Sequence, residues 1–481
     1  MAGTEVKRIL GSSWLGRNSF VTKYGGNFLT GCIDVLLILI PHLLIFSLKG
    51  LQKSRAKRIE KSTSVDIPND IIFDVLTRLP TNSLCHMRCV SKTTLRMVDN
   101  PYFATLHTPR LLNSSGTNYA AAVEVPQLML LAQSWSSRAK RSTALQSLKY
   151  SGEHGLTKSK HWHAKILSEF GNYQVDFVFC NLVCFKHEIR TFGLLLNPLR
   201  GQVLELPKNH LLPTYGKKWY GMGFDSITST HKIVCISQID RYRNLIRKHP
   251  DILVAHVYTL GARSSSWQEI HQVPQCEFTS KNVSAYGDMH WLIDRDVIGG
   301  SPNYIMSFDF KKDEFVWNPY PNSSQGFVCG SHDMHLLNLG GCLAIVSSGH
   351  LSVEIWVLKN YEKKEWVLDY KIDNKMFFGH SLRSIETCGE WEHGIFLTEK
   401  YPIIFYFWDM RYKSMRYINH ETLLPGIFSY YHLPGTRRSQ SKLKLSILSY
   451  TKSLISSETY GNLVERRVCS ETAKTRTWQI E

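Results

Sequence analysis

The hydrophobic positions along the chain follow three successive patterns. Residues 28–48 (FLTGCIDVLLILIPHLLIFSL) form a continuous apolar run. Over residues 67–98, apolar side chains recur at steps of three and four, as on one face of a helix. From about residue 125 onward, short apolar and aromatic runs alternate with turn residues. The pattern predicts an apolar N-terminal segment, a small helical module and a β-rich domain.

The apolar run at 28–48 is long enough to cross a membrane as one helix. At about 1.5 Å per residue it would span roughly 32 Å, close to the thickness of a hydrocarbon core. Asp34, Pro41 and His42 weaken this interpretation, since an acidic side chain inside a membrane is costly. The basic stretch 49–64 follows directly, and the positive-inside bias would then place the downstream chain in the cytosol. We expect either a membrane anchor or an extension appended to a soluble protein.

The helical module begins at Ile67-Pro68, because proline suits the first turn of a helix. Its first helix has one apolar face, made by Ile71, Ile72, Val75, Leu76 and Leu79. Leu79-Pro80 ends this helix, since a residue before proline is pushed out of the helical region.

Two more short helices are predicted in the same module. The second carries Leu84, Met87 and Val90, and the third covers 94–98 and is closed by Asn100-Pro101. Three helices this short bury little apolar surface alone, so the module needs a partner or a neighbouring domain.

The rest of the chain predicts strands. Short apolar runs mark Val175–Phe179, Phe192–Leu196, Lys232–Ile236, Ile252–Tyr258, Tyr304–Phe308, Cys342–Val346, Val353–Leu358 and Ile403–Trp408. Segments 306–317, 354–366 and 404–418 each read as a strand, a charged hairpin turn and a second aromatic strand. Sandwich, barrel and propeller all fit short strands, and the faint repetition favours a kelch-like or propeller-type domain of about six blades.

Composition and charge add two constraints. The chain has 481 residues, 43% of them hydrophobic, so it can bury more than one core. The net charge of +17 comes largely from surpluses of Lys and Arg at the two ends. Nucleic acid or anionic lipid would fit such charge, but no recognition helix or aromatic-basic ladder accompanies it. We interpret the surpluses as solvated tails and expect no nucleic-acid partner.

No pattern in the sequence selects a catalytic or metal site. The eleven cysteines are irregularly spaced without a C-x-x-C, which favours free thiols. Four histidines form close pairs without an evident third ligand: His161, His163, His332 and His335. Four tryptophans fit blade-to-blade core better than a ligand-binding face: Trp267, Trp291, Trp317 and Trp356. We expect no catalytic residues, no cofactor and no metal.

Residues 67–107 read IPNDIIFDVLTRLPTNSLCHMRCVSKTTLRMVDNPYFATLH. This segment resembles the F-box, whose plant versions carry Leu-Pro, Arg-Leu-Pro, Ser-Leu, Arg-Cys-Val-Ser-Lys and a closing Pro-x-Phe…His. Two positions depart from those words. Ile67 replaces the usual Leu, and Thr94 stands where a Trp usually follows Val-Ser-Lys, which removes a large aromatic side chain from the small core.

The downstream chain resembles the F-box-associated domain of large plant families, a propeller-like module. The matching segments are LLLNPLRGQVLELP (194–207), GMGFDSITSTHKIVCI (221–236), HVYTLGARSSSWQEI (256–270) and GDMHWLI (287–293). Leu196 stands where that family often has Trp before Asn-Pro. The two resemblances together cover roughly 65–420, and the F-box precedes the β domain, as in the family.

The resemblance implies a non-catalytic substrate-receptor subunit, or adaptor, of an SCF-type cullin-RING ubiquitin ligase. The F-box would bind the Skp-type linker protein and through it a cullin-RING scaffold, while the β domain would hold an unknown protein target for ubiquitination. The positions carried over to the linker contact are Ile67, Pro68, Ile71, Ile72, Leu76, Leu79, Pro80, Leu84, Val90 and Ser91. About half of these would pack the helices together instead.

A second hypothesis belongs to another class. Thr94 motivates a propeller-type binding protein, membrane-tethered or soluble, whose F-box no longer recruits a ligase. Under either hypothesis we expect a cytoplasmic or nuclear protein, with the F-box facing the cytosol if 28–48 spans a membrane. The expected segments are a basic N-terminal segment at 1–27, the apolar run at 28–48, a basic linker at 49–64, the F-box at 65–108, the β domain at 125–430 and a basic C-terminal appendage at 431–481.

Overall fold

The computed structural model describes seventeen segments of the chain. They are residues 67–112, 124–135, 142–151, 155–158, 173–187, 193–197, 202–211, 216–239, 252–261, 266–293, 304–321, 333–378, 385–392, 394–399, 404–419, 442–454 and 464–465. The chain divides into two units, Met1–Pro68 and Asn69–Glu481, and every helix and strand below belongs to the second. The segments predicted at 1–27, 28–48 and 49–64 lie outside the described residues. None of the helices that the structure describes is both long and apolar enough to cross a membrane.

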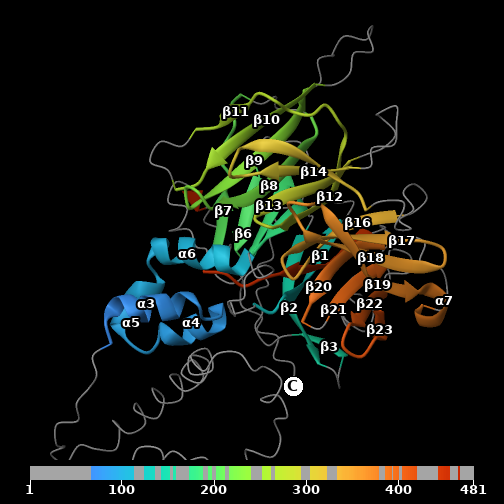
Figure 1. Ribbon diagram of the computed structural model, residues 1–481, viewed down its shortest axis with the longest axis horizontal. Coiled ribbons are helices and arrows are strands. Elements are labelled where there is room, and N and C mark those ends of the chain that lie inside the picture. The colour runs from blue at the N-terminus through green and yellow to red at the C-terminus, as the bar shows by residue number, and fades with distance from the viewer. Residues whose placement is uncertain are drawn as a thin grey trace, which may run out of the picture. The chain divides into compact units, whose positions relative to one another are not determined.

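The F-box module contains four helices, one more than the sequence predicts (Figure 1). They are α3 (Asn69–Thr77), α4 (Thr81–Met87), α5 (Lys92–Val98) and α6 (Pro101–Leu112). The first three lie where the apolar periodicity predicts them. Pro101 is the first residue of α6, where its missing N–H costs nothing, and the Asn100 Oδ1 accepts a hydrogen bond from Tyr102 N at 2.9 Å. The dipeptide that closes α5 therefore also begins α6.

The four helices share a small apolar core. Its buried side chains are Leu76, Leu84, Met87, Val98, Phe103 and Ala104. Phe73 packs edge-to-face on Phe103, with ring centroids 5.2 Å apart, which joins α3 to α6. The extra helix thus supplies aromatic core that three helices alone would lack.

Six antiparallel sheets make up the β domain. One sheet has five strands: β4 (Tyr173–Phe179), β5 (Leu182–His187), β6 (Gly193–Asn197), β7 (Gln202–Glu205) and β25 (Val464–Glu465). The next sheet along the chain has four strands: β8 (Lys218–Asp225), β9 (Thr230–Ile239), β10 (Ile252–Thr259) and β11 (Gln268–Ile270). The next two are β12 (Phe278–Ala285), β13 (Asp288–Ile293), β14 (Tyr304–Asp309) and β15 (Glu314–Pro319), then β16 (Asp333–Leu339), β17 (Cys342–Ser348), β18 (Ser352–Asn360) and β19 (Glu365–Asp373), which α7 (Asn374–Phe377) follows.

The remaining two sheets close the series. One is β20 (Ile385–Trp391), β21 (Gly394–Glu399), β22 (Ile404–Asp409) and β23 (Ser414–Asn419), and the other runs β24 (Lys442–Tyr450), β1 (Gln127–Trp135), β2 (Ser142–Ser151) and β3 (Gly155–Lys158). Every strand segment predicted from the sequence falls on an observed strand, and the three predicted hairpins are β14–β15, β18–β19 and β22–β23.

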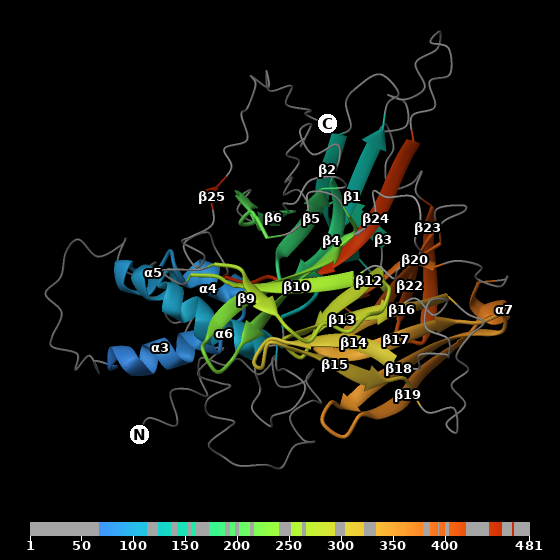
Figure 2. The ribbon, with the colours of Figure 1, turned by 90° about the horizontal axis from the view of Figure 1, so that it is seen from above.

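The sheets form a closed six-bladed propeller. Each of the inner strands β4, β8, β12, β16 and β20 contacts the next in chain order, β4 also contacts β12 directly, and β24 contacts both β20 and β4 (Figures 1 and 2). β24 pairs with β1 along its whole length, from Gln127↔Tyr450 to Trp135↔Lys442. The first blade therefore combines three N-terminal strands with one C-terminal strand, which closes the ring.

The role of β24 corrects the prediction of an appendage at 431–481. Leu443, Leu445 and Ile447 alternate with polar residues, which is the period-two pattern of a strand with one buried face. Leu445 and Ile447 are buried against Leu128 and Leu130 of β1. The Ser- and Lys-rich surroundings hide this strand in the sequence, because the alternation is short and its polar half is charged.

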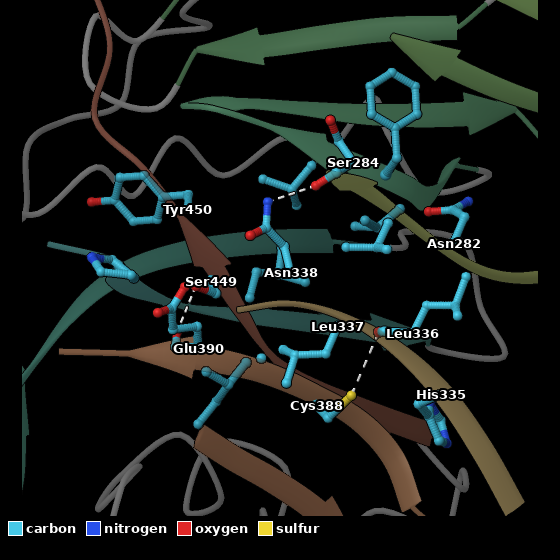
Figure 3. Close-up of a pocket in the computed structure, with 18 of the residues that line it drawn as sticks. Asn282, Ser284, His335, Leu336, Leu337, Asn338, Cys388, Glu390, Ser449 and Tyr450 are labelled. Atoms are coloured by element: carbon cyan, nitrogen blue, oxygen red, sulfur yellow. Dashed lines mark hydrogen bonds between the residues drawn. The ribbon is translucent and has the colours of Figure 1, made fainter. Parts of the chain in front are cut away.

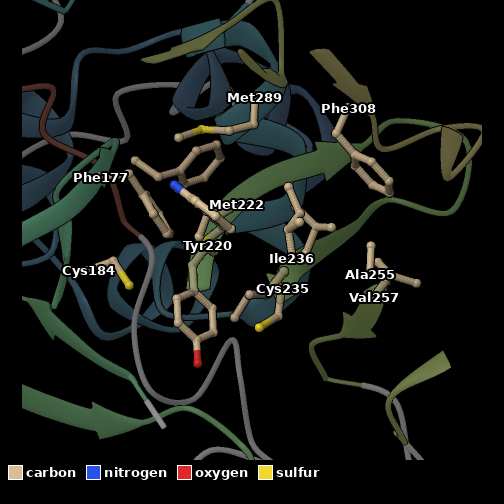
Figure 4. Close-up of a cluster of buried hydrophobic side chains, with 14 of the residues drawn as sticks. Phe177, Cys184, Tyr220, Met222, Cys235, Ile236, Ala255, Val257, Met289 and Phe308 are labelled. Carbon is tan, nitrogen blue, oxygen red and sulfur yellow. The ribbon is translucent and has the colours of Figure 1, made fainter. Parts of the chain in front are cut away.

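Apolar clusters join neighbouring blades. Figure 4 shows one of them, in which Phe177 of β4, Tyr220 and Met222 of β8 and Phe308 of β14 pack together. Close backbone approach is built into this cluster, since a Cβ at Gly223 would lie 2.0 Å from the Phe310 ring. Close packing therefore explains the glycine at position 223 of the GMGF motif at 221–224.

The four tryptophans singled out from the sequence differ in burial: two are fully buried and two are partly exposed. Trp291 and Trp356 are buried between blades, as the core interpretation predicts. Trp317 is 41% exposed and packs edge-to-face on Tyr304. Trp267 is half-buried, and its Nε1 donates to Pro207 O at 3.2 Å.

Candidate linker-binding surface and central cavity

The F-box module carries apolar side chains that no helix of the module covers. Ile67 and Ile71 are 51% and 54% exposed, and Pro68 is exposed between them in the sequence. Leu95 of α5 and Tyr102 of α6 are also exposed. Exposed large apolar side chains on so small a module are typical of a protein-binding surface.

The ten predicted linker-contact residues separate by burial. Leu76 and Leu84 are 1% and 0% exposed and belong to the core of the module. Four are half-buried: Ile72, Leu79, Pro80 and Val90. Four are exposed: Ile67, Pro68, Ile71 and Ser91. Only the exposed and half-buried residues are available to a partner without unfolding the module.

Leu95 and Tyr102 are exposed apolar residues of the module that were not among the ten predicted linker-contact residues. Leu95 follows Thr94, which is buried, so it points away from the face that packs. Its signal in the sequence is an apolar residue off the buried face of a helix. Tyr102 belongs to α6, the helix that the periodicity did not predict.

Thr94, the position of the missing Trp, has a structural role. Its Oγ1 donates to Met87 O at 2.8 Å, which links α5 to the end of α4. Ser91 is the N-cap of α5: its side chain accepts a hydrogen bond from Thr94 N at 3.0 Å, and the Thr94 side chain accepts one from Ser91 N at 3.2 Å. Where the family usually has a bulky tryptophan, Thr94 thus forms a capping box with Ser91 at the N-terminus of α5.

A half-open central cavity of about 600 Å³ lies among the inner strands of the propeller. Its wall comes mainly from the inner strands β4, β12, β16, β20 and β24 (Figure 3). Most charged groups in this wall already have partners. The Asp176 carboxylate binds Lys186 Nζ at 2.8 Å and accepts from Tyr220 N at 2.7 Å, and Lys281 Nζ donates to Met334 O at 2.8 Å.

Glu390, near the end of β20, is a carboxylate of this wall with few partners. Its Oε2 accepts a hydrogen bond from Gly340 N at 3.0 Å, and this is the one hydrogen bond to the carboxylate among the residues that the structure describes. Burial raises the pKa of Glu390 to about 7, and the hydrogen bond from Gly340 opposes that rise.

Hydrogen bonds between blades tie one end of the cavity together. Tyr286 N donates to Gly341 O at 3.2 Å, and Thr451 N donates to Cys180 O at 3.2 Å. Ser449 Oγ donates to Glu390 O at 2.6 Å, beside the Glu390 side chain in Figure 3. These bonds hold the short hairpins of successive blades at fixed positions.

One of the four singled-out histidines is described. His335 is buried at the cavity wall, while His161, His163 and His332 lie outside the described residues. Within the described segments, no three His, Cys, Asp or Glu side chains gather as a metal would require.

A helical F-box followed by a six-bladed β-propeller defines a class of protein, and comparison with known proteins gives the family. The model of the F-box domain matches residues 65–106, and that of the F-box associated beta propeller domain matches residues 132–429. The second match covers more than half of the chain, so the chain belongs to the F-box-associated β-propeller family.

Plant proteins of this kind are similar along most of their length. "F-box protein At1g47340" of Arabidopsis thaliana is 25% identical over 68% of this chain and 69% of its own. "Putative F-box protein At1g30920" of the same plant is 26% identical over 64% of this chain and 75% of its own. Among solved structures, a chain of a nidogen/laminin complex aligns over 67% of this chain and 98% of its own with 10% identity and a TM-score of 0.36, too low to bear on function.

Proposed function

We propose that this protein is the substrate-receptor subunit of an SCF-type cullin-RING ubiquitin ligase. The F-box binds a Skp-type linker protein, and through it the cullin-RING scaffold, while the propeller holds a protein target. The receptor itself performs no chemistry: it raises the effective concentration of target lysines near the ubiquitin-conjugating enzyme. The observation that carries the proposal is the set of exposed apolar side chains on the F-box helices, Ile71, Leu95 and Tyr102.

The linker contact uses the side chains that the module leaves uncovered. Ile67, Ile71, Leu95 and Tyr102 would lose their contact with water on binding, and each buried aliphatic side chain contributes roughly 1.5–3 kcal/mol. Leu76 and Leu84 act indirectly, by keeping the helices packed. This division narrows the ten predicted residues to those that a partner can touch.

Target recognition belongs to the face of the propeller where the inner strands begin. Tight hairpins such as Cys180–Asn181 and Tyr286–Gly287 occupy the opposite face, where the inner strands end. Longer connections lead into the inner strands, for example from β15 to β16 and from β23 to β24. Long connections on a rigid scaffold are where binding specificity is commonly placed.

The substitution Ile71→Glu tests the linker contact. Ile71 is 54% exposed, so a charge there leaves the core of the module intact but places a carboxylate in the contact. We expect binding of the purified linker protein, measured by calorimetry, to weaken at least tenfold, about 1.4 kcal/mol.

A matched variant, Ile227→Glu, serves as control, because Ile227 is 75% exposed in the β8–β9 hairpin, far from the F-box in sequence. It should bind the linker as the wild type does. Unchanged linker binding by Ile71→Glu, with a normal melting temperature, would refute the assigned surface.

The alternative, a propeller-type binding protein with a non-recruiting F-box, receives no support from Thr94, since that side chain is buried and caps α5. We further propose a cytoplasmic or nuclear location, with the F-box in the cytosol if residues 28–48 anchor the protein in a membrane. Carbonate extraction of membranes decides the anchor, because a peripheral protein is released and a spanning one is retained.

A further inference from the structure

The central cavity has the size and the wall of a small-molecule site. Ligand pockets in proteins typically enclose roughly 300–1,000 Å³, and this cavity encloses about 600 Å³. Apolar side chains such as Leu337 and Ile447 share its wall with polar ones such as Asn282 and Asn338. The kind of ligand depends on which hydrogen-bonding and charged groups of the wall lack a partner within the protein.

The side-chain donors of the wall are largely used between blades. Asn338 Nδ2 donates to Ser284 O at 2.7 Å, as Figure 3 shows, and Asn282 Nδ2 donates to Asp176 O at 3.0 Å. Gln133 Nε2 donates to Tyr173 O at 3.0 Å. The amide donors of these side chains are therefore used within the protein, whereas Ser284 Oγ is buried without a hydrogen-bond partner among the described residues. A ligand that offers N–H groups would meet the Glu390 carboxylate.

The charged side chains of the wall also favour a ligand with N–H donors. Asp176 is neutralised by Lys186, and the Glu124 carboxylate accepts a hydrogen bond from Thr81 N. Glu390 has no cation within salt-bridge distance among the described residues, and its side chain is half-buried at the wall of the cavity. Partial removal from water makes the carboxylate harder to ionise and raises its pKa to about 7.

Independently of any ligase role, we propose that this cavity binds a small organic cation with a guanidinium or alkylammonium group, for which Glu390 is the counter-ion. The cation donates N–H hydrogen bonds to the Glu390 carboxylate and stabilises its ionised form. Its hydrocarbon part lies against the apolar side chains of the inner strands.

Butylguanidine and butylurea test the proposal on the full-length protein, because the two molecules have nearly the same shape and differ in charge. By calorimetry, we expect butylguanidine to bind with a dissociation constant of roughly 1 mM or tighter and butylurea at least tenfold more weakly. Equal binding of the two, or binding of neither, would overturn the proposal.

Glu390→Gln adds a test at the level of the residue. Glutamine retains an acceptor for Gly340 N, so the fold is kept, and a melting curve checks this. We expect at least a tenfold loss of butylguanidine binding, with linker binding unchanged. Glu392→Gln is the control, since Glu392 is exposed two residues further along, and it should bind butylguanidine as the wild type does. Undiminished binding by Glu390→Gln would also overturn the proposal.

Discussion

At the scale of single residues, burial separates side chains that the sequence presents as equivalent. Ile71 and Leu76 lie on the apolar face of one predicted helix, yet Ile71 is 54% exposed and Leu76 is 1% exposed. The periodicity identifies that face, but it does not say which part of the face meets α6 and which part meets a partner. Thr94 shows the same limit, because a position with an unexpected residue turned out to be a cap rather than a defect.

Replacing Thr94 with valine should destabilise the module while leaving its outer surface unchanged. The change removes the hydrogen bonds that Thr94 Oγ1 makes with Met87 O and Ser91 N, which together are worth about 1–2 kcal/mol, and it keeps the bond from the residue-94 backbone N–H to Ser91 Oγ. Thermal unfolding measures the loss. Thr93→Val is the matched control, since Thr93 is an exposed neighbour in the same helix and should have an effect below about 0.5 kcal/mol. Equal stability of the two variants would show that the cap is unimportant.

At the scale of elements, the sequence predicted three F-box helices and those strands whose patterns are local. The hairpins at 306–317, 354–366 and 404–418 each carry both strands and their turn in one continuous segment. Two of the elements that escaped prediction show why. α6 has a weak apolar pattern and begins at the proline that ends α5, and β24 finds its partner strand about three hundred residues away. Pairing over such a separation leaves no local signal in one sequence.

Removal of β24 should open the propeller. A chain that ends after residue 441 lacks the strand that pairs with β1 and leaves Leu128 and Leu130 without their neighbours Leu445 and Ile447. We expect the cooperative thermal transition to be lost or lowered by roughly 10 °C or more. A chain that ends after residue 465 keeps β24 and β25 and should unfold as the full-length protein does. If both truncated chains unfold alike, β24 does not close the ring.

The central cavity could not be predicted from the sequence, for a related reason. Glu390, Gly340 and Ser449 belong to three different blades, and only the closed ring brings them together. Nothing in the residues around Glu390 distinguishes it from the many exposed acidic residues of the chain. The propeller class was predictable, whereas the wall of its cavity depends on which inner strands face one another.

At the scale of the whole molecule, the proposal assigns one task to each domain. The F-box offers exposed apolar side chains to the linker protein, and the propeller offers a scaffold of six sheets to the target. A receptor of this kind works by bringing a target close to an enzyme, so its two binding activities should be separable by mutation. Ile71 is assigned to the first activity, and the cavity around Glu390 is lined mainly by the inner strands of the propeller.

Affinity purification of the full-length protein from plant cells with the proteasome inhibited tests the central claim most directly. The wild type should enrich the Skp-type linker protein and a cullin together with ubiquitinated target, because an SCF receptor is bound to all of them at once. Ile71→Glu, with the F-box surface altered, should lose the linker and the cullin and retain the target. Absence of linker and cullin from the wild-type sample, or their equal recovery with Ile71→Glu, would contradict the account.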